Sequence, residues 1–164
     1  MDHVVRTFGL RAIPLALALS AASCGGVYIP NTDVDDTPEN REVVVFCERY
    51  RKAVERRDVG GLLKLASPKY YETGGNIDPE DDIDFAGLEG YLKEKFREAS
   101  GIRYEIRYRR VTRERDMVFV DFTYSASYRI TVPDSDTQKW RSVVEENRLE
   151  LIPDGDGFLI VAGM

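Results

Sequence analysis

Carboxylates and tyrosines are the residues of this chain that could carry out proton transfer. The only histidine, His3, lies in an N-terminal segment that we expect export to remove, which excludes Ser-His-Asp, Cys-His and His-metal sites from the mature protein. Burial can raise the pKa of a carboxyl group so that it acts as an acid or a base, and a nearby tyrosine can donate to a developing oxyanion. The candidates for such a pair are Asp121, Glu145, Glu146, Tyr104, Tyr124 and Tyr128.

Alternation along the chain argues against Asp121 as a catalytic group. Apolar and polar residues alternate around it with the period of a strand, which places Asp121 on the face opposite Phe122 and Tyr124. We therefore favour a binding or interaction module over an enzyme and expect no cofactor and no metal. The catalytic candidates that we retain are Asp121 and Glu146.

Tyrosines recur on the apolar faces of neighbouring predicted strands, at Tyr104, Tyr108, Tyr124 and Tyr128. They could line an apolar cavity that presents hydroxyl groups to a small amphipathic ligand. They could equally form ordinary cross-strand aromatic pairs, which is the commoner role of such residues. Trp140 allows the same two interpretations. The ligand-binding candidates are Tyr104, Tyr124, Tyr128 and Trp140.

Carboxylates occupy every second position of an acidic segment before the third predicted helix. The first, third, fifth, seventh and twelfth places of an EF-hand-like register fall on Asp78, Glu80, Asp82, Asp84 and Glu89. Ile83 stands at the sixth place, where the tight turn needs glycine, and no helix precedes the segment. We expect a solvated loop in which Asp84 caps a helix.

Residues 1–23 have the composition of a secretory signal peptide. Arg6 and Arg11 precede an apolar run of about ten residues that ends in small residues. The run is shorter than the ~20 residues that a membrane-spanning helix needs. Ala21-Ala22-Ser23-Cys24 resembles the lipobox of bacterial lipoproteins, which implies acylation of Cys24; cleavage before Ser23 and plain secretion is the alternative. Gly25 after the cysteine, by resemblance to enterobacterial sorting, favours the outer membrane.

The second cysteine, Cys47, falls in the apolar stripe of the first predicted helix. We expect a buried structural thiol, because a reactive one would need a cationic and partly open site.

Charge limits the partners of the mature protein. The chain has a formal net charge of -6, with Lys and Arg numbering 23 against 29 Asp and Glu. Nucleic-acid binding requires a concentrated basic patch, and electrostatic adhesion to anionic lipid requires a basic segment. We expect neither.

The remaining sequence predicts a short tether followed by one α+β domain. Residues 24–39 are acidic, contain Pro30 and Pro38, and lack helical or strand periodicity, so we expect a lipidated N-terminus and a flexible, solvated tether.

Residues 40–164 are expected to form the domain. Helices begin after the N-caps Thr37, Asp58 and Asp84. After Gly101 the periodicity changes to two, and the predicted strands are 102–109, 117–132, 139–152 and 158–162. Strands of this length must curl, so N-terminal helices should cover a strongly curved, mostly antiparallel four-stranded sheet in the shape of a cone.

This domain resembles the nuclear-transport-factor-2-like (NTF2-like) superfamily over about residue 40 to the C-terminus. The resemblance depends on the long first helix, on the segments 56–63 and 67–71, and on the last hairpin around Asp154-Gly155-Asp156-Gly157. It implies a cone that encloses a pocket and a homodimer formed through the outer face of the sheet. The superfamily includes isomerases, dehydratases and transport factors, so the resemblance implies a fold and no single activity.

We therefore predict a membrane-anchored envelope lipoprotein that faces the periplasm from the outer membrane, or a secreted protein if Cys24 is not acylated. Its domain is expected to bind a small apolar ligand or another protein without catalysis. The alternative is a cofactor-free isomerase or dehydratase that uses a carboxylate–tyrosine pair in the cone.

Overall fold

The computed structural model describes residues 26–74, 81–131 and 137–164, which form three helices and two antiparallel sheets. The four long strands pair in chain order as β3 (Ser100–Glu114), β4 (Met117–Thr131), β5 (Gln138–Asp154) and β6 (Gly157–Ala162). The predicted α+β class and the predicted strand succession are confirmed.

Each helix begins at the polar residue that the sequence predicts as its cap. The helices are α1 (Pro38–Glu55), α2 (Val59–Leu65) and α3 (Phe85–Glu98). The side chains of Thr37, Asp58 and Asp84 accept hydrogen bonds from backbone N–H groups three residues later, at 3.2, 2.8 and 2.8 Å. These bonds satisfy donors that a helix N-terminus otherwise leaves without partners.

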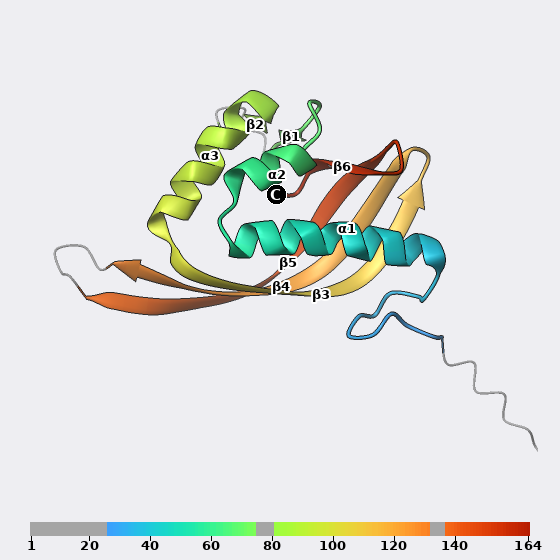
Figure 1. Cartoon of the computed structure of the whole chain (residues 1–164), viewed down its shortest axis with the longest axis horizontal. Coiled ribbons are helices and arrows are strands. Elements are labelled where there is room, and N and C mark those ends of the chain that lie inside the picture. Colours follow the sequence, from blue (N-terminus) through green and yellow to red (C-terminus); the bar gives the residue numbers. More distant parts are fainter. Residues whose placement is uncertain (1–25, 75–80, 132–136) are drawn as a thin grey trace, which may run out of the picture.

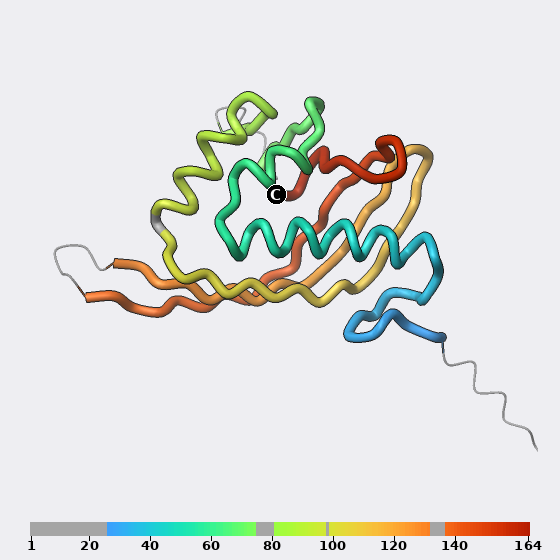
Figure 2. Tube along the Cα trace, viewed as in Figure 1, coloured from blue at the N-terminus to red at the C-terminus, as the bar shows by residue number. Residues whose placement is uncertain are grey.

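The large sheet bends around α1, which lies across one of its faces, while α3 covers one end (Figures 1 and 2). We call the face that contacts α1 the inner face and the opposite one the outer face. A register shift between Tyr108 and Arg110 interrupts the β3–β4 pairing, and such bulges increase the local twist of a sheet. The curvature leaves the inner face concave.

The core lies between α1 and one half of the inner face. The side chains there that are at most 1% exposed are Val43, Phe46, Cys47, Val120, Phe122, Leu149, Leu151 and Ile160. Cys47 is thus buried as expected, and burial raises the pKa of its thiol to about 12. A thiol with such a pKa is inert at neutral pH.

The N-terminal segment corrects the prediction of a solvated tether, which is wrong for residues 26–37. Tyr28 forms a β-bridge with Asp35, and Val34 between them is 2% exposed. The backbone N–H of Asp33 donates to the carbonyl oxygen of Tyr108 on the edge strand β3 at 2.9 Å. One buried valine and backbone pairing to the sheet edge hold the segment, although its composition is that of a flexible chain.

Two short strands, β1 (Tyr71–Glu72) and β2 (Ile83–Asp84), pair antiparallel and precede α3. These two strands were not predicted from the sequence. Of the acidic register, Asp78 and Glu80 lie outside the described residues. Asp82 accepts a hydrogen bond from the hydroxyl of Tyr71, and Asp84 caps α3. No helix within the described ranges is long and apolar enough to span a membrane.

Candidate functional site

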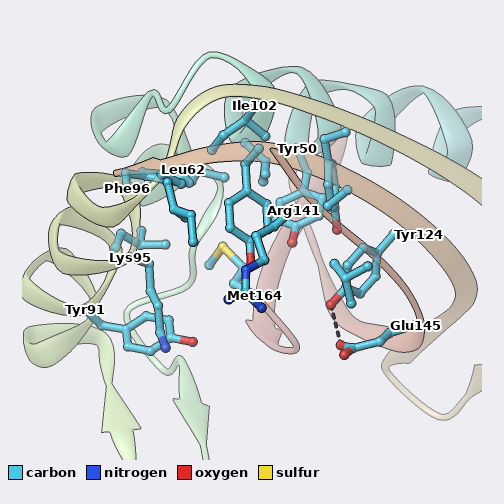
Figure 3. A pocket seen from close by; sticks show the side chains of 18 residues that line it. Tyr50, Leu62, Tyr91, Lys95, Phe96, Ile102, Tyr124, Arg141, Glu145 and Met164 are labelled. Carbon is cyan, nitrogen blue, oxygen red and sulfur yellow. Dashed lines mark hydrogen bonds between the residues drawn. The ribbon is translucent and has the colours of Figure 1, made fainter. Parts of the chain in front are cut away.

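An open pocket of about 620 Å³ lies between α3, the C-terminal end of α1 and the inner face of the sheet (Figure 3). Most of its wall is apolar: Val54, Leu62, Leu92, Phe96, Ala99, Ile102, Ala126, Ile130, Val143 and Met164. The polar and aromatic side chains that complete the wall are Tyr50, Tyr91, Lys95, Tyr104, Tyr124, Tyr128, Arg141 and Glu145. Its volume lies within the ~300–1,000 Å³ that is typical of small-molecule sites.

Three alternate residue pairs of the β4–β5 ladder form the floor of the pocket. Their partners are Tyr124 with Glu145, Ala126 with Val143, and Tyr128 with Arg141. Because alternate residues of a strand share a face, all six side chains belong to the inner face. The small Ala126 in the middle pair leaves the space that larger side chains fill in the core.

Tyr124 and Glu145 form the closest polar contact in the pocket. The Tyr124 hydroxyl donates to Oε2 of Glu145 at 2.6 Å (Figure 3). Burial, and then this hydrogen bond to a carboxylate, raise the pKa of Tyr124 above its usual range. A carboxylate and a tyrosine thus share the pocket, as the enzyme hypothesis requires, but the tyrosine proton is directed to the carboxylate rather than into the open space.

The other tyrosines divide between pocket wall and core. Tyr104 is 6% exposed, and its ring lies 5.3 Å from that of Tyr124 and 6.5 Å from that of Tyr50. Burial raises the pKa of Tyr104 to about 12, so it stays neutral. Tyr108 lies outside the pocket, where its hydroxyl donates to Oε1 of Glu48 at 2.9 Å. Tyr104, Tyr124 and Tyr128 line the pocket, and Tyr104 also packs against neighbouring rings.

Two cationic side chains reach the pocket from opposite walls. Lys95 of α3 lies over the ring of Tyr91 at 5.4 Å from its centroid. Arg141 of β5 projects between the α3 wall and the Tyr124–Glu145 pair (Figure 3). No hydrogen bond, ion pair or ring contact joins the Arg141 guanidinium to another described residue.

The retained catalytic candidates Asp121 and Glu146 do not reach the pocket. Asp121 lies on the outer face, where its carboxylate accepts hydrogen bonds from Arg148 at 2.6 Å and from Arg110 at 2.9 Å. These bonds, first the one from Arg148, lower the pKa of Asp121, which disfavours the protonated form that a general acid needs. Glu146 follows the inward-facing Glu145 and so belongs to the outer face. The carboxylate that meets a tyrosine is Glu145.

The prediction that Trp140 helps to bind a ligand is wrong, because its side chain lies on the outer face, away from the pocket. It is 54% exposed, between Arg103 and Arg129, whose guanidinium carbons are 5.5 and 5.8 Å from its ring centroid. Only one of the first eleven residues of β5 is not exposed. Both faces of this stretch therefore carry polar residues, and the sequence does not show by alternation which residues face inward.

Lys95, Tyr91 and Arg141 line the pocket, although the sequence pattern did not single them out. A signal for Arg141 was present: counting back in twos from the buried Leu149 passes through Asn147, Glu145 and Val143 to Arg141. Lys95 and Tyr91 carried no such signal, since their place depends on how α3 packs over the sheet. Among the described residues no cluster of three or more His, Cys, Asp or Glu side chains is placed to hold a metal ion.

Solved structures with this arrangement of helices and sheet include a ketosteroid isomerase-like protein from Erwinia carotovora atroseptica, with a TM-score of 0.60 and 13% sequence identity over 78% of this chain and 95% of that one. A proposed dehydratase of the NTF2-like family from Streptomyces avermitilis gives a TM-score of 0.58 at 14% identity, over 77% of this chain and 95% of that one. The fold is NTF2-like. The sequence itself matches no protein-family model and no curated protein sequence.

A solved structure that is described with another role is about equally similar. A proposed calcium/calmodulin-dependent protein kinase II association domain from Xanthomonas campestris has a TM-score of 0.58 and 16% identity, over 82% of this chain and 94% of that one. At such identities the likeness shows the fold alone, and the function must be argued from the pocket.

Proposed function

We propose that the domain binds a small, largely apolar molecule in the pocket of its cone and does not transform it. The observation that carries this proposal is the Ala126–Val143 pair at the floor of the pocket. The small side chains of this pair leave a pocket of about 620 Å³ above one half of the inner face, whereas the other half of that face is tightly packed against α1. A concave, mainly apolar cavity with a few polar groups is the usual form of a small-ligand site.

The test uses the neutral fluorescent amine phenylnaphthylamine and the full-length chain carrying Cys24→Ser, which cannot be acylated. We expect the dye to bind and to increase in fluorescence. Ala126→Phe should abolish the signal, because the added ring occupies the pocket. Ser125→Phe is the matched control, since Ser125 is the preceding residue of β4 and faces outward.

Failure of the dye to bind, or equal binding by both phenylalanine variants, would contradict the proposal. Native mass spectrometry of the same chain adds an independent observation: we expect a retained small molecule whose mass adduct disappears in Ala126→Phe and persists in Ser125→Phe.

The Tyr124–Glu145 contact favours one second candidate, a cofactor-free isomerase or dehydratase in which Glu145 moves the proton. Against it stands the direction of the hydrogen bond, since Tyr124 donates to the proposed base itself and not into the open space of the pocket. Glu145→Gln separates the two functions. For a binding protein the variant keeps dye affinity within about twofold, whereas for an enzyme it removes turnover, because loss of a general base costs about 10²–10⁴ in rate.

We further propose that acylation of Cys24 holds this domain at a membrane. Gly25 alone separates Cys24 from the described segment, in which Val27 and Tyr28 are 73% and 53% exposed. That segment lies at the end of the sheet remote from α3 and its pocket (Figure 1). An anchored domain would therefore present the pocket away from the lipid.

A further inference from the structure

We propose that the ligand of this pocket is an anionic amphiphile, with one carboxylate or sulfonate on an apolar body, and that Arg141 binds the anionic group. The inference deepens the proposed function and depends on it. It begins from the balance of charge inside the pocket, where Lys95 and Arg141 face a single carboxylate, Glu145.

Arg141 differs from most other arginines of the domain in having no partner among the residues that the structure describes. Arg107 and Arg109 pair with Asp33, Arg110 and Arg148 pair with Asp121, and Arg103 and Arg129 flank Trp140. Arg141 has no such contact among the described residues, and it is exposed where it lines the largely apolar pocket, so its guanidinium donors are open to a ligand.

Glu145 does not neutralise Arg141. The two residues are four apart on β5, which separates their backbones by about 14 Å along the strand. The Glu145 carboxylate instead accepts the hydrogen bond of Tyr124 at 2.6 Å. The pocket therefore offers a guanidinium that can bind a carboxylate or sulfonate with paired hydrogen bonds.

The apolar wall determines the rest of the ligand. Leu92, Phe96 and Ile102 form the side of the pocket toward α3, and Ala126 and Val143 form the floor beneath Arg141. An anionic group at Arg141 would leave the remainder of the molecule against these side chains. Lys95, on the opposite wall, adds a second positive charge that favours anions in a protein whose net charge is -6.

The test compares two dyes that share one aromatic body. Anilinonaphthalene sulfonate carries a sulfonate, and phenylnaphthylamine lacks it. In the full-length Cys24→Ser chain we expect Arg141→Met to weaken the anionic dye about tenfold or more, because a hydrogen-bonded charge pair is lost, and to leave the neutral dye within about twofold. Arg141→Lys should recover part of the loss. Lys139→Met, two residues away on the same strand and outside the pocket wall, removes the same charge and should change neither affinity.

The outcomes separate the two proposals. If the neutral dye fails to bind the parent chain, the proposed function fails. If the neutral dye binds and is lost in Ala126→Phe, but Arg141→Met leaves the anionic dye unaffected, the binding function stands and the anionic ligand is overturned. Equal weakening of both dyes by Arg141→Met would also overturn it, since Arg141 would then act only as part of the wall.

Discussion

Nη2 of Arg107 lies 2.6 Å from Oδ1 of Asp33, and this ion pair joins the N-terminal segment to the outer face of β3. The second carboxylate oxygen of Asp33 lies 2.8 Å from Nη1 of Arg109. Asp33→Asn should weaken this attachment while leaving the core unchanged. We expect amide hydrogen exchange at residues 33–36 to increase roughly two- to fivefold, as the loss of exposed ion pairs predicts, with little change in α1. Unchanged exchange would mean that Val34 and the backbone bonds alone hold the segment.

The same attachment should respond to acid. Hydrogen bonds from Arg107 and then Arg109 lower the pKa of Asp33 from 3.8 to about 2. Because the folded-state pKa is lowered, the contact stabilises the docked segment fully above about pH 4 and is lost as the pH falls toward 2. Limited proteolysis with an acid-active protease should cleave the segment faster at pH 2 than at pH 4. Asp33→Asn should remove most of this difference, and a variant that retains it would assign the effect to other carboxylates.

Two valines of α1 offer a matched measure of core packing. Val43 is 0% exposed and Val45 is 64% exposed on the other side of the helix. Val43→Ala should lower the free energy of unfolding by about 2 kcal/mol, because two buried methyl groups are lost and a cavity remains. Val45→Ala should change it by less than about 0.5 kcal/mol, since the helix preference of alanine offsets the small loss of contact. Chemical denaturation measures both, and equal effects would contradict the assigned inner face of α1.

These elements also show what the sequence could predict. Strict alternation in β3 and β4 identified the inward residues Tyr104, Tyr124 and Tyr128, and the polar residues Thr37, Asp58 and Asp84 marked the helix starts. The predictions for Trp140 and for the N-terminal segment failed, because the local order of polar and apolar residues does not show which distant elements a side chain will contact. Trp140 lies in a stretch of β5 that is almost wholly exposed, so polarity did not distinguish its faces. Val34 is a single apolar residue in an acidic segment, and its burial depends on pairing with the distant strand β3.

Trp140 provides a direct test of the corrected strand face. It is the only tryptophan of the chain and is 54% exposed on the outer face. Its fluorescence should therefore have the long emission wavelength of a solvated indole and should be quenched readily by acrylamide. Saturation of the pocket with a non-fluorescent apolar ligand should leave this emission unchanged, and Trp140→Ala should leave dye affinity within about twofold, as expected for a surface residue. A blue-shifted emission on ligand binding would place Trp140 in the pocket after all.

Acylation of Cys24 is the prediction on which the location of the protein depends. Radiolabelled palmitate should enter the chain in a bacterial host with a lipoprotein pathway, and the product should fractionate with membranes, because more than one acyl chain gives stable anchoring. Cys24→Ser should lose the label, whereas Cys47→Ser should keep it, since Cys47 is buried in α1. The Cys24→Ser chain should still bind phenylnaphthylamine, because the pocket lies at the other end of the sheet from the docked segment. An unlabelled chain that retains its leader would contradict anchoring and export together, while an unlabelled chain cleaved before Ser23 would support plain secretion.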